Sequence, residues 1–164
     1  MNEPADTGPG EGQLAGFLPY QLSVTSNAVS GLIAERYRKR FGLKIPEWRV
    51  MAVLGDSGRM TQRALTAATV MDKVAVNRAV KVLEERGLIA RVPNPGDGRS
   101  HLLALTGEGE AIHAEVMPLA RATEAELLAD LAPEEEAVLR RLLAGLRGRA
   151  LRLAGHTREG PEQG

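Results

Sequence analysis

The sequence predicts a mainly α-helical fold with one small β-hairpin. Apolar residues recur at three- and four-residue steps through most of the chain, which is the spacing of one buried helix face. Aromatic residues make up only 3% of the sequence, so the core must consist mainly of Leu, Val and Ala, which suits helices. One stretch breaks the pattern: VPNPGDGRSHLLALT, from Val92 to Thr106, combines two prolines, two glycines and an Asp-Gly pair, which are residues typical of a turn.

The first two helices follow from apolar spacing and end signals. The spacing predicts a helix over 17–40, which ends at Gly42 after the cations of RYRKRF. A second helix, PEWRVMAVLGD, begins with Pro46 at its first position, and we expect Gly55 and Gly58 to close it.

Two shorter helices and the hairpin come next. Thr61 is placed to cap TQRALTAAT, and Asp72 begins DKVAVNRAVKVLEERG, which Gly87 ends. The apolar stripe of this second short helix consists of Val76, Ala79, Val80 and Leu83. Its opposite, basic side carries Lys73, Asn77, Arg78 and Lys81. The segments LIARV and HLLAL are the expected strands of the hairpin.

Two long helices complete the chain. Thr106 caps GEGEAIHAEVMPLARATEAELLADL, in which Pro118 is expected to introduce a kink because it lacks an N–H. Pro133 and three glutamates begin a last helix with a leucine-rich stripe. The apolar stripes of the outer helices need a partner. Packing within the chain and a two-chain bundle are both open on this pattern alone.

Charge is segregated along the chain although its sum is zero. Residues 31–49 hold six basic and two acidic residues, and 59–101 hold eight and four, so that each segment carries +4. Residues 106–143 hold three basic and nine acidic residues, which gives −6. A basic middle predicts contact with a polyanion, because phosphate binding needs clustered Lys and Arg. Two differently charged solvated faces are the alternative.

Several classes of protein do not fit the composition. There is no cysteine, which excludes disulfides, thiol redox sensing and Cys-ligated zinc. His101, His113 and His156 have no metal-ligand spacing, and no catalytic motif, cofactor loop or membrane span is present. The first sixteen residues do not resemble a signal peptide. We therefore expect a cytoplasmic protein that is not an enzyme and needs no cofactor.

Two short helices joined by a tight turn predict a helix-turn-helix, whose second helix fits the major groove of DNA. Thr61 and Gln62 are candidates to hold a phosphate at the first helix. The groove-facing candidates are Lys73, Val74, Ala75, Asn77 and Arg78. Asn77 can pair with an adenine edge, Arg78 with guanine or a phosphate, and the two apolar side chains can touch thymine methyl groups. A hairpin directly after this helix makes a winged helix, whose tip can place an arginine in the minor groove.

A structural interpretation of the same residues stays open. Arg78 can form an ion pair with Glu84 or Asp72 and never touch DNA. Lys73 and Lys81, taken singly, are ordinary solvated residues.

The segment from about Ile45 to Gly109 resembles the MarR family of bacterial winged-helix transcriptional regulators. The motifs that carry the resemblance are TQ before the first short helix, DK…R…LE..GLI.R across the second, and D.RS….LT..G through the wing. The flanking helices match the family's layout, so the resemblance covers most of the chain. It divides the chain into a disordered lead (1–16), an N-terminal dimerisation helix (17–44), a winged-helix lobe (45–105), C-terminal dimerisation helices (106–154) and a disordered tail (155–164).

The resemblance implies a homodimer that presents two winged helices to a near-palindromic operator and represses transcription until a small phenolic or anionic ligand binds. It assigns Arg99 as the wing arginine and Asp97 as an acid that braces the wing by pairing with an arginine. The expected DNA-contacting residues are then Thr61, Gln62, Lys73, Val74, Ala75, Asn77, Arg78, Lys81, Arg99 and Ser100. Tyr37 and Trp48 lie near the implied ligand pocket, and core or interface aromatics are the alternative for both.

Three residues depart from the family pattern. Gly98 replaces a second wing arginine, which predicts a weaker wing contact. Ala75 and Asn77 stand where Ser or Thr is usual, which predicts an unusual operator. Ala132 stands where Ser or Thr often caps the last helix, a loss of about 1 kcal/mol. An architectural DNA binder or a protein-interaction module without ligand control is the alternative function.

Overall fold

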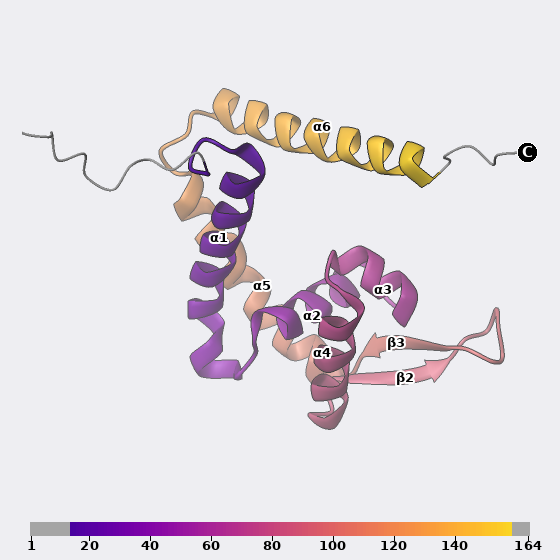
Figure 1. Ribbon diagram of the computed structural model, residues 1–164. Helices are drawn as coiled ribbons and strands as arrows, with labels where there is room; N and C mark the ends of the chain where they lie inside the picture. Colours follow the sequence, from indigo (N-terminus) through magenta and orange to yellow (C-terminus); the bar gives the residue numbers. More distant parts are fainter. Residues whose placement is uncertain (1–13, 159–164) are drawn as a thin grey trace, which may run out of the picture. The chain divides into compact units, whose positions relative to one another are not determined.

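Six helices and three short strands make up residues 14–158, the part of the chain that the computed structural model describes (Figure 1). In chain order they are α1 (Leu18–Phe41), α2 (Ile45–Ser57), β1 (Met60–Thr61), α3 (Gln62–Thr69), α4 (Lys73–Glu85), β2 (Ile89–Pro93), β3 (His101–Leu105), α5 (Gly107–Leu128) and α6 (Pro133–Arg158). The predicted fold class, mainly α with a small hairpin, is confirmed. The chain divides into two compact units between Thr123 and Glu124, and each is described by itself.

The sheet has one more strand than the sequence predicts. Its order is β1–β3–β2, and both pairings are antiparallel. The hairpin pairs Ile89 with Leu105 at its base and Pro93 with His101 toward its tip. The added strand β1 pairs Met60 with Leu103 and is only two residues long, too short to show an alternating pattern. It ties the segment before α3 to the hairpin.

The predicted caps position the helices of the first unit. The side chain of Thr61 accepts a hydrogen bond from the N–H of Ala64 (3.2 Å), and that of Asp72 from the N–H of Ala75 (2.8 Å). Gly42 and Gly87 end their helices with positive φ angles of 63° and 70°. The expectation that Gly55 helps to close α2 is wrong.

Helix α2 instead continues to Ser57 and stops at Gly58, whose φ is 75°. A glycine does not end a helix when the following residues keep helical hydrogen bonds, and the N–H of Gly58 still donates to the Leu54 carbonyl (2.9 Å). Pro118 lies within α5, which is one helix from Gly107 to Leu128.

The core of the first unit lies among α2, α3, α4 and β3 and is built mainly from aliphatic residues, with Trp48 among them on α2. All four residues of the apolar stripe predicted for α4 are buried, and α1 and α5 add Tyr37 and Val116. Arg86 joins the end of α4 to the end of α1, because its guanidinium donates to the carbonyl oxygens of Phe41 (2.6 Å) and Gly42 (3.3 Å). The winged-helix elements thus share one core, with the hairpin extending from it (Figure 1).

The second unit consists of the end of α5 and α6. Glu135 accepts a hydrogen bond from the N–H of Ala132 (2.8 Å), which is the half of a capping box that needs no hydroxyl at position 132. Helix α6 continues to Arg158 and so includes 155–158, the first residues of the tail expected from the sequence. Residues 14–16 form a turn before α1, and the expected disorder of 1–13 and 159–164 lies outside the described residues. No helix in the described part of the chain is long and apolar enough to cross a membrane.

Candidate nucleic-acid interface

Helix α4 separates a buried face from a polar one. Lys73, Asn77, Arg78 and Lys81 are exposed, and Val74 is 57% exposed, so these candidates share the outer side of the helix. Ala75 is half-buried, and its N–H is occupied by the cap of Asp72. The outer face of α4 therefore offers cations, one amide and one apolar side chain within its first three turns.

The interpretation that ties Arg78 into an ion pair is wrong. Glu84 pairs with Arg91 of β2, with 2.7 Å between Oε1 and Nε. Asp72 is used as the helix cap, and among residues 14–158 no ion pair of Arg78 is formed. Lys81 lies 3.8 Å from Glu85 across exposed side chains, an interaction that contributes little in water. Arg78 is thus free to meet a ligand.

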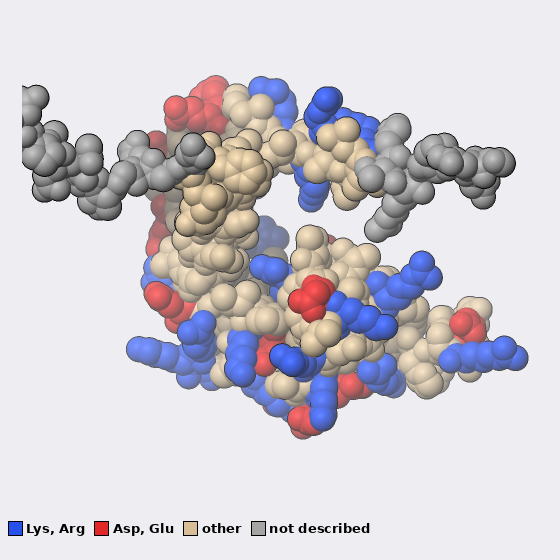
Figure 2. Space-filling view, viewed as in Figure 1, with Lys and Arg blue, Asp and Glu red and all other residues tan. Residues whose placement is uncertain are grey.

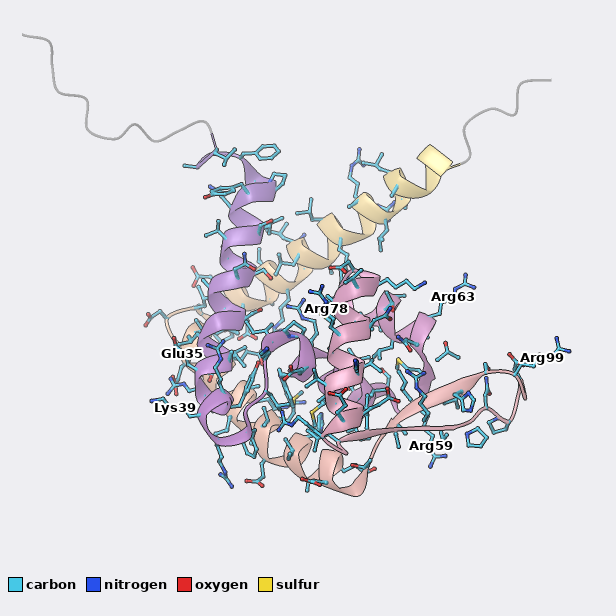
Figure 3. The ribbon with its side chains drawn as sticks, turned by 60° about the horizontal axis from the view of Figure 1, so that its bottom comes forward. Glu35, Lys39, Arg59, Arg63, Arg78 and Arg99 are labelled. Atoms are coloured by element: carbon cyan, nitrogen blue, oxygen red, sulfur yellow. The ribbon has the colours of Figure 1, made fainter. Side chains whose placement is uncertain are left out.

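The hairpin tip is organised by hydrogen bonds of short polar side chains. Asn94, which the sequence reasoning missed, donates to the hydroxyl of Ser100 (2.8 Å) and accepts from the N–H of Gly96 (3.0 Å). Asp97 accepts from the backbone N–H of Arg99 (3.0 Å). Within the described residues Asp97 does not form the ion pair with an arginine that the family resemblance implies. The side chain of Arg99 is exposed at the tip (Figure 3).

Gln62 lies at the start of α3, but its side chain is directed to α4 and β2. Its Nε2 donates to Oδ1 of Asn77 (2.5 Å), and its Oε1 accepts from Nη2 of Arg91 (3.2 Å). Thr61 caps α3 with its hydroxyl, so its side chain is engaged as well.

Sequence reasoning missed the role of Arg91 and Glu84, although both stand in the motif LE..GLI.R. The available signal was a carboxylate and an arginine on the two elements that flank one short loop, since such residues often pair.

The basic residues of 59–101 divide into structural and free cations. Arg86 and Arg91 are engaged within the protein, so the charge count overstates the number available to a ligand. Figure 2 shows Lys and Arg side chains over the visible face of the winged-helix lobe. In Figure 3, Arg63 and Arg99 reach outward from α3 and the hairpin tip, and Arg78 is exposed on α4. This arrangement presents separate cations on three elements of one unit.

Tyr37 and Trp48 are buried, at 1% and 8% exposure, and both belong to the core. Their ring centroids lie 5.7 Å apart, and Trp48 stacks in turn on His113 at 5.6 Å. Burial raises the pKa of Tyr37 to about 12. The two aromatic residues also line a pocket of about 180 Å³ between α1 and α2. The other residues of its lining are Ser30, Ile33, Ile45, Arg49 and Ala52.

Known proteins resemble this chain over the same elements. The MarR family model matches residues 41–100. The transcriptional regulator HosA of Escherichia coli O111:H- is 33% identical over 98 residues, which cover 60% of this chain and 73% of HosA. The HTH-type transcriptional repressor Rv2887 of Mycobacterium tuberculosis (strain H37Rv) is 29% identical over 132 residues, which cover 80% of this chain and 91% of Rv2887.

A solved structure shares the fold as well. A mutant MarR from Escherichia coli complexed with operator DNA is similar with a TM-score of 0.70 and 25% identity, over 79% of this chain and 92% of that chain. These relatives are transcriptional regulators and not enzymes.

Proposed function

This chain belongs to the MarR family of transcriptional regulators and is a DNA-binding protein, and we propose that it acts as a homodimeric repressor on a near-palindromic operator. The repressor assignment is supported by the name of its relative Rv2887. The mode of binding is supported by the relative MarR, whose structure was solved with operator DNA. Each subunit of the proposed dimer presents one winged helix to one half of the operator.

The exposed polar face of α4 is the observation that carries this proposal. An α-helix with its side chains is about 10–12 Å wide, and the major groove is about 12 Å wide. With α4 in the groove, Asn77 and Arg78 meet base edges and Lys73 meets a phosphate. Arg99 at the hairpin tip then reaches the adjacent minor groove, whose negative potential attracts arginine. The backbone N–H groups at the start of α3 contribute a phosphate contact.

Exposed apolar side chains on both units support the homodimer. In the first unit Phe17, Leu18, Tyr20 and Val24 are between 43% and 56% exposed at the start of α1. In the second unit Leu139, Leu142, Leu143 and Leu146 form a stripe on α6 that is between 40% and 56% exposed. Contiguous apolar surface of this kind is covered by a partner in a stable protein. A second copy of the chain supplies an identical surface, as two-fold symmetry requires.

The pocket between α1 and α2 supports control by a small phenolic or anionic ligand. Its volume of about 180 Å³ accommodates one aromatic ring. Arg49 supplies a charge-assisted donor for a carboxylate or phenolate, and Tyr37 and Trp48 supply the apolar wall. Trp48 is the only tryptophan, so its fluorescence reports on this pocket directly. Titration with benzoate and phenolate anions should change that fluorescence, and Arg49→Ala should weaken the response.

Fluorescence anisotropy with labelled duplexes tests the repressor function. At physiological salt the protein should bind a fragment from its own upstream region with a Kd in the nanomolar to micromolar range and prefer it to random DNA. Equal binding of both duplexes would favour the architectural alternative, and no binding of either would favour the protein-interaction module. Light scattering should give about twice the chain mass of 17.6 kDa, whereas a monomer would contradict the dimer.

A further inference from the structure

A continuous row of polar side chains connects β2 to the outer face of α4. It begins at Glu84, which holds the guanidinium of Arg91 through Oε1 (2.7 Å to Nε) and Oε2 (3.3 Å to Nη2). Nη2 of Arg91 also donates to Oε1 of Gln62 (3.2 Å), and Nε2 of Gln62 donates to Oδ1 of Asn77 (2.5 Å). Three elements, β2, α3 and α4, thus meet at one amide of the proposed recognition helix.

The direction of these hydrogen bonds follows from the chemistry of arginine. A guanidinium only donates, so the amide atom of Gln62 that faces Arg91 must be the oxygen. The Nε2 group of Gln62 is then the atom that faces Asn77, and it donates. The atom of Asn77 that accepts this hydrogen bond must be its oxygen, Oδ1. The unengaged group of Asn77 is its Nδ2 amino group, which carries two donors, while Oδ1 keeps one further lone pair.

We propose that Arg91 is a specificity-determining positioning residue that fixes Asn77 as a hydrogen-bond donor toward DNA. This inference rests on the proposed placement of α4 in the major groove. A bidentate asparagine–adenine pair needs both an acceptor and a donor from the asparagine, and here Gln62 occupies one of the two lone pairs of Oδ1 and turns that oxygen toward α3. Guanine instead offers two acceptors, N7 and O6. Asn77 therefore selects guanine over adenine at the position it contacts, which replaces the adenine pairing expected from the sequence.

The row of side chains is not needed for the fold. The side chains of Arg91 and Glu84 are 43% and 30% exposed, and surface ion pairs contribute little to stability. The core residues of α4 face the opposite side of the helix. A substitution of Arg91 should therefore change the orientation of the two amides while the domain stays folded.

Selection of bound duplexes from a randomised pool, followed by anisotropy on matched duplexes, tests the proposal. The wild-type protein should prefer guanine to adenine by about tenfold at one position of each half-site. In Arg91→Met the amide of Gln62 is free to flip, so this preference should fall to about twofold or less. In Arg91→Lys an ammonium still donates to Gln62, and the preference should be restored. Arg63→Met, which removes an equal charge from α3, should weaken binding to both duplexes equally and keep the preference for guanine over adenine.

The variant Gln62→Glu tests the direction of the hydrogen bond between residue 62 and Asn77. A carboxylate only accepts, so it must take a hydrogen bond from Nδ2 of Asn77 and leave Oδ1 facing the DNA. The preferred base should then change from guanine to one with an exposed amino group, cytosine or adenine. A preference for guanine that persists in Gln62→Glu would overturn the proposal.

The outcomes separate this inference from the proposed function. If the wild-type protein selects no sequence at all, the placement of α4 in the groove is wrong, and the inference falls with it. If the wild-type protein selects an operator and Arg91→Met selects the same bases with the same discrimination, the proposed function stands and the role of Arg91 is wrong. A preference lost in Arg91→Met and also in Arg91→Lys would show a structural role only and would overturn the proposal.

Discussion

Gly109 on α5 lies directly against the backbone of Leu88 at the base of the hairpin. A Cβ built on Gly109 would come within 2.0 Å of the Leu88 carbonyl oxygen and 3.0 Å of its carbonyl carbon. The same carbonyl accepts a hydrogen bond from the N–H of Thr106 (3.0 Å), and the hydroxyl of Thr106 donates to the Gly87 carbonyl (2.6 Å). The backbone at the start of α5 is thereby in direct contact with the backbone at the base of the hairpin.

Gly109→Ala should destabilise the protein because backbone atoms at this contact cannot move aside as a flexible side chain would. We expect the free energy of unfolding to fall by about 2 kcal/mol, within the usual cost of overpacking. Urea denaturation measures it. Gly107→Ala, in the same helix with no atom near its Cβ position, is the matched control and should be close to neutral. Equal stability of the two variants would contradict the close approach.

Val70, between α3 and α4, should be replaceable with a gain in stability. It is the only non-glycine residue of 14–158 with a positive φ (53°), and its side chain is 87% exposed. A β-branched residue is strained in this conformation, and the exposed side chain makes little compensating contact. Val70→Gly should raise the free energy of unfolding by about 1 kcal/mol. Gly87→Val imposes the same strain at φ 70° and should have the opposite effect, and a stabilising Gly87→Val would contradict this reasoning.

Arg99→Ala and Asn77→Ala should weaken DNA binding in different ways. In the proposed docking Arg99 lies in the minor groove without reading bases, so its loss should lower affinity for all operators and reduce the salt slope by about one. In the same docking Asn77 meets a base edge, so its loss should change which bases are preferred. Anisotropy over a range of salt, with Arg121→Ala on α5 as a charge control, measures both. Unchanged affinity and preference in both variants would contradict the proposed docking.

Alkaline pH should reduce stability through Tyr37. Its phenol is neutral when protonated, and burial raises its pKa to about 12 in the folded protein, against about 10 when unfolded. The unfolded chain therefore releases this proton first, and the stability that the neutral phenol contributes is complete below pH 10 and lost as the pH rises toward 12. Relative to Tyr37→Phe, wild-type unfolding free energy should fall by about 1.4 kcal/mol per pH unit in this window. Parallel pH profiles would show that Tyr37 titrates normally.

Local features could be predicted from the sequence, and features that depend on distant partners could not. The caps Thr61, Asp72 and Thr106 act within three residues along the chain, so their side-chain chemistry predicts them. The strand β1 is defined only by its pairing with β3, which the local pattern does not contain. In the same way the predicted phosphate contact of Gln62 did not anticipate Arg91, because α3 and β2 meet only in the folded protein.

Composition also describes the electrostatics only in part. The basic count between Arg59 and His101 predicts the charged lobe correctly. It does not show that the guanidinium of Arg86 donates to the Phe41 carbonyl at the end of α1 and is therefore not available to a ligand. Tyr37 and Trp48 were assigned both a core and a pocket interpretation, and the structure places them in the core with one side lining a pocket. Packing decides such cases, since an aromatic residue at helical spacing suits either role.

A hydroxyl-radical footprint on the operator shows whether a dimer places α4 of each subunit in the major groove and Arg99 in the flanking minor groove. We predict two protected half-sites whose centres are separated by a whole number of helical turns, about 10 base pairs each, with additional minor-groove protection on their outer sides. That outer protection should disappear in Arg99→Ala and remain in Arg121→Ala. A single protected segment, or outer protection that persists without Arg99, would contradict the account.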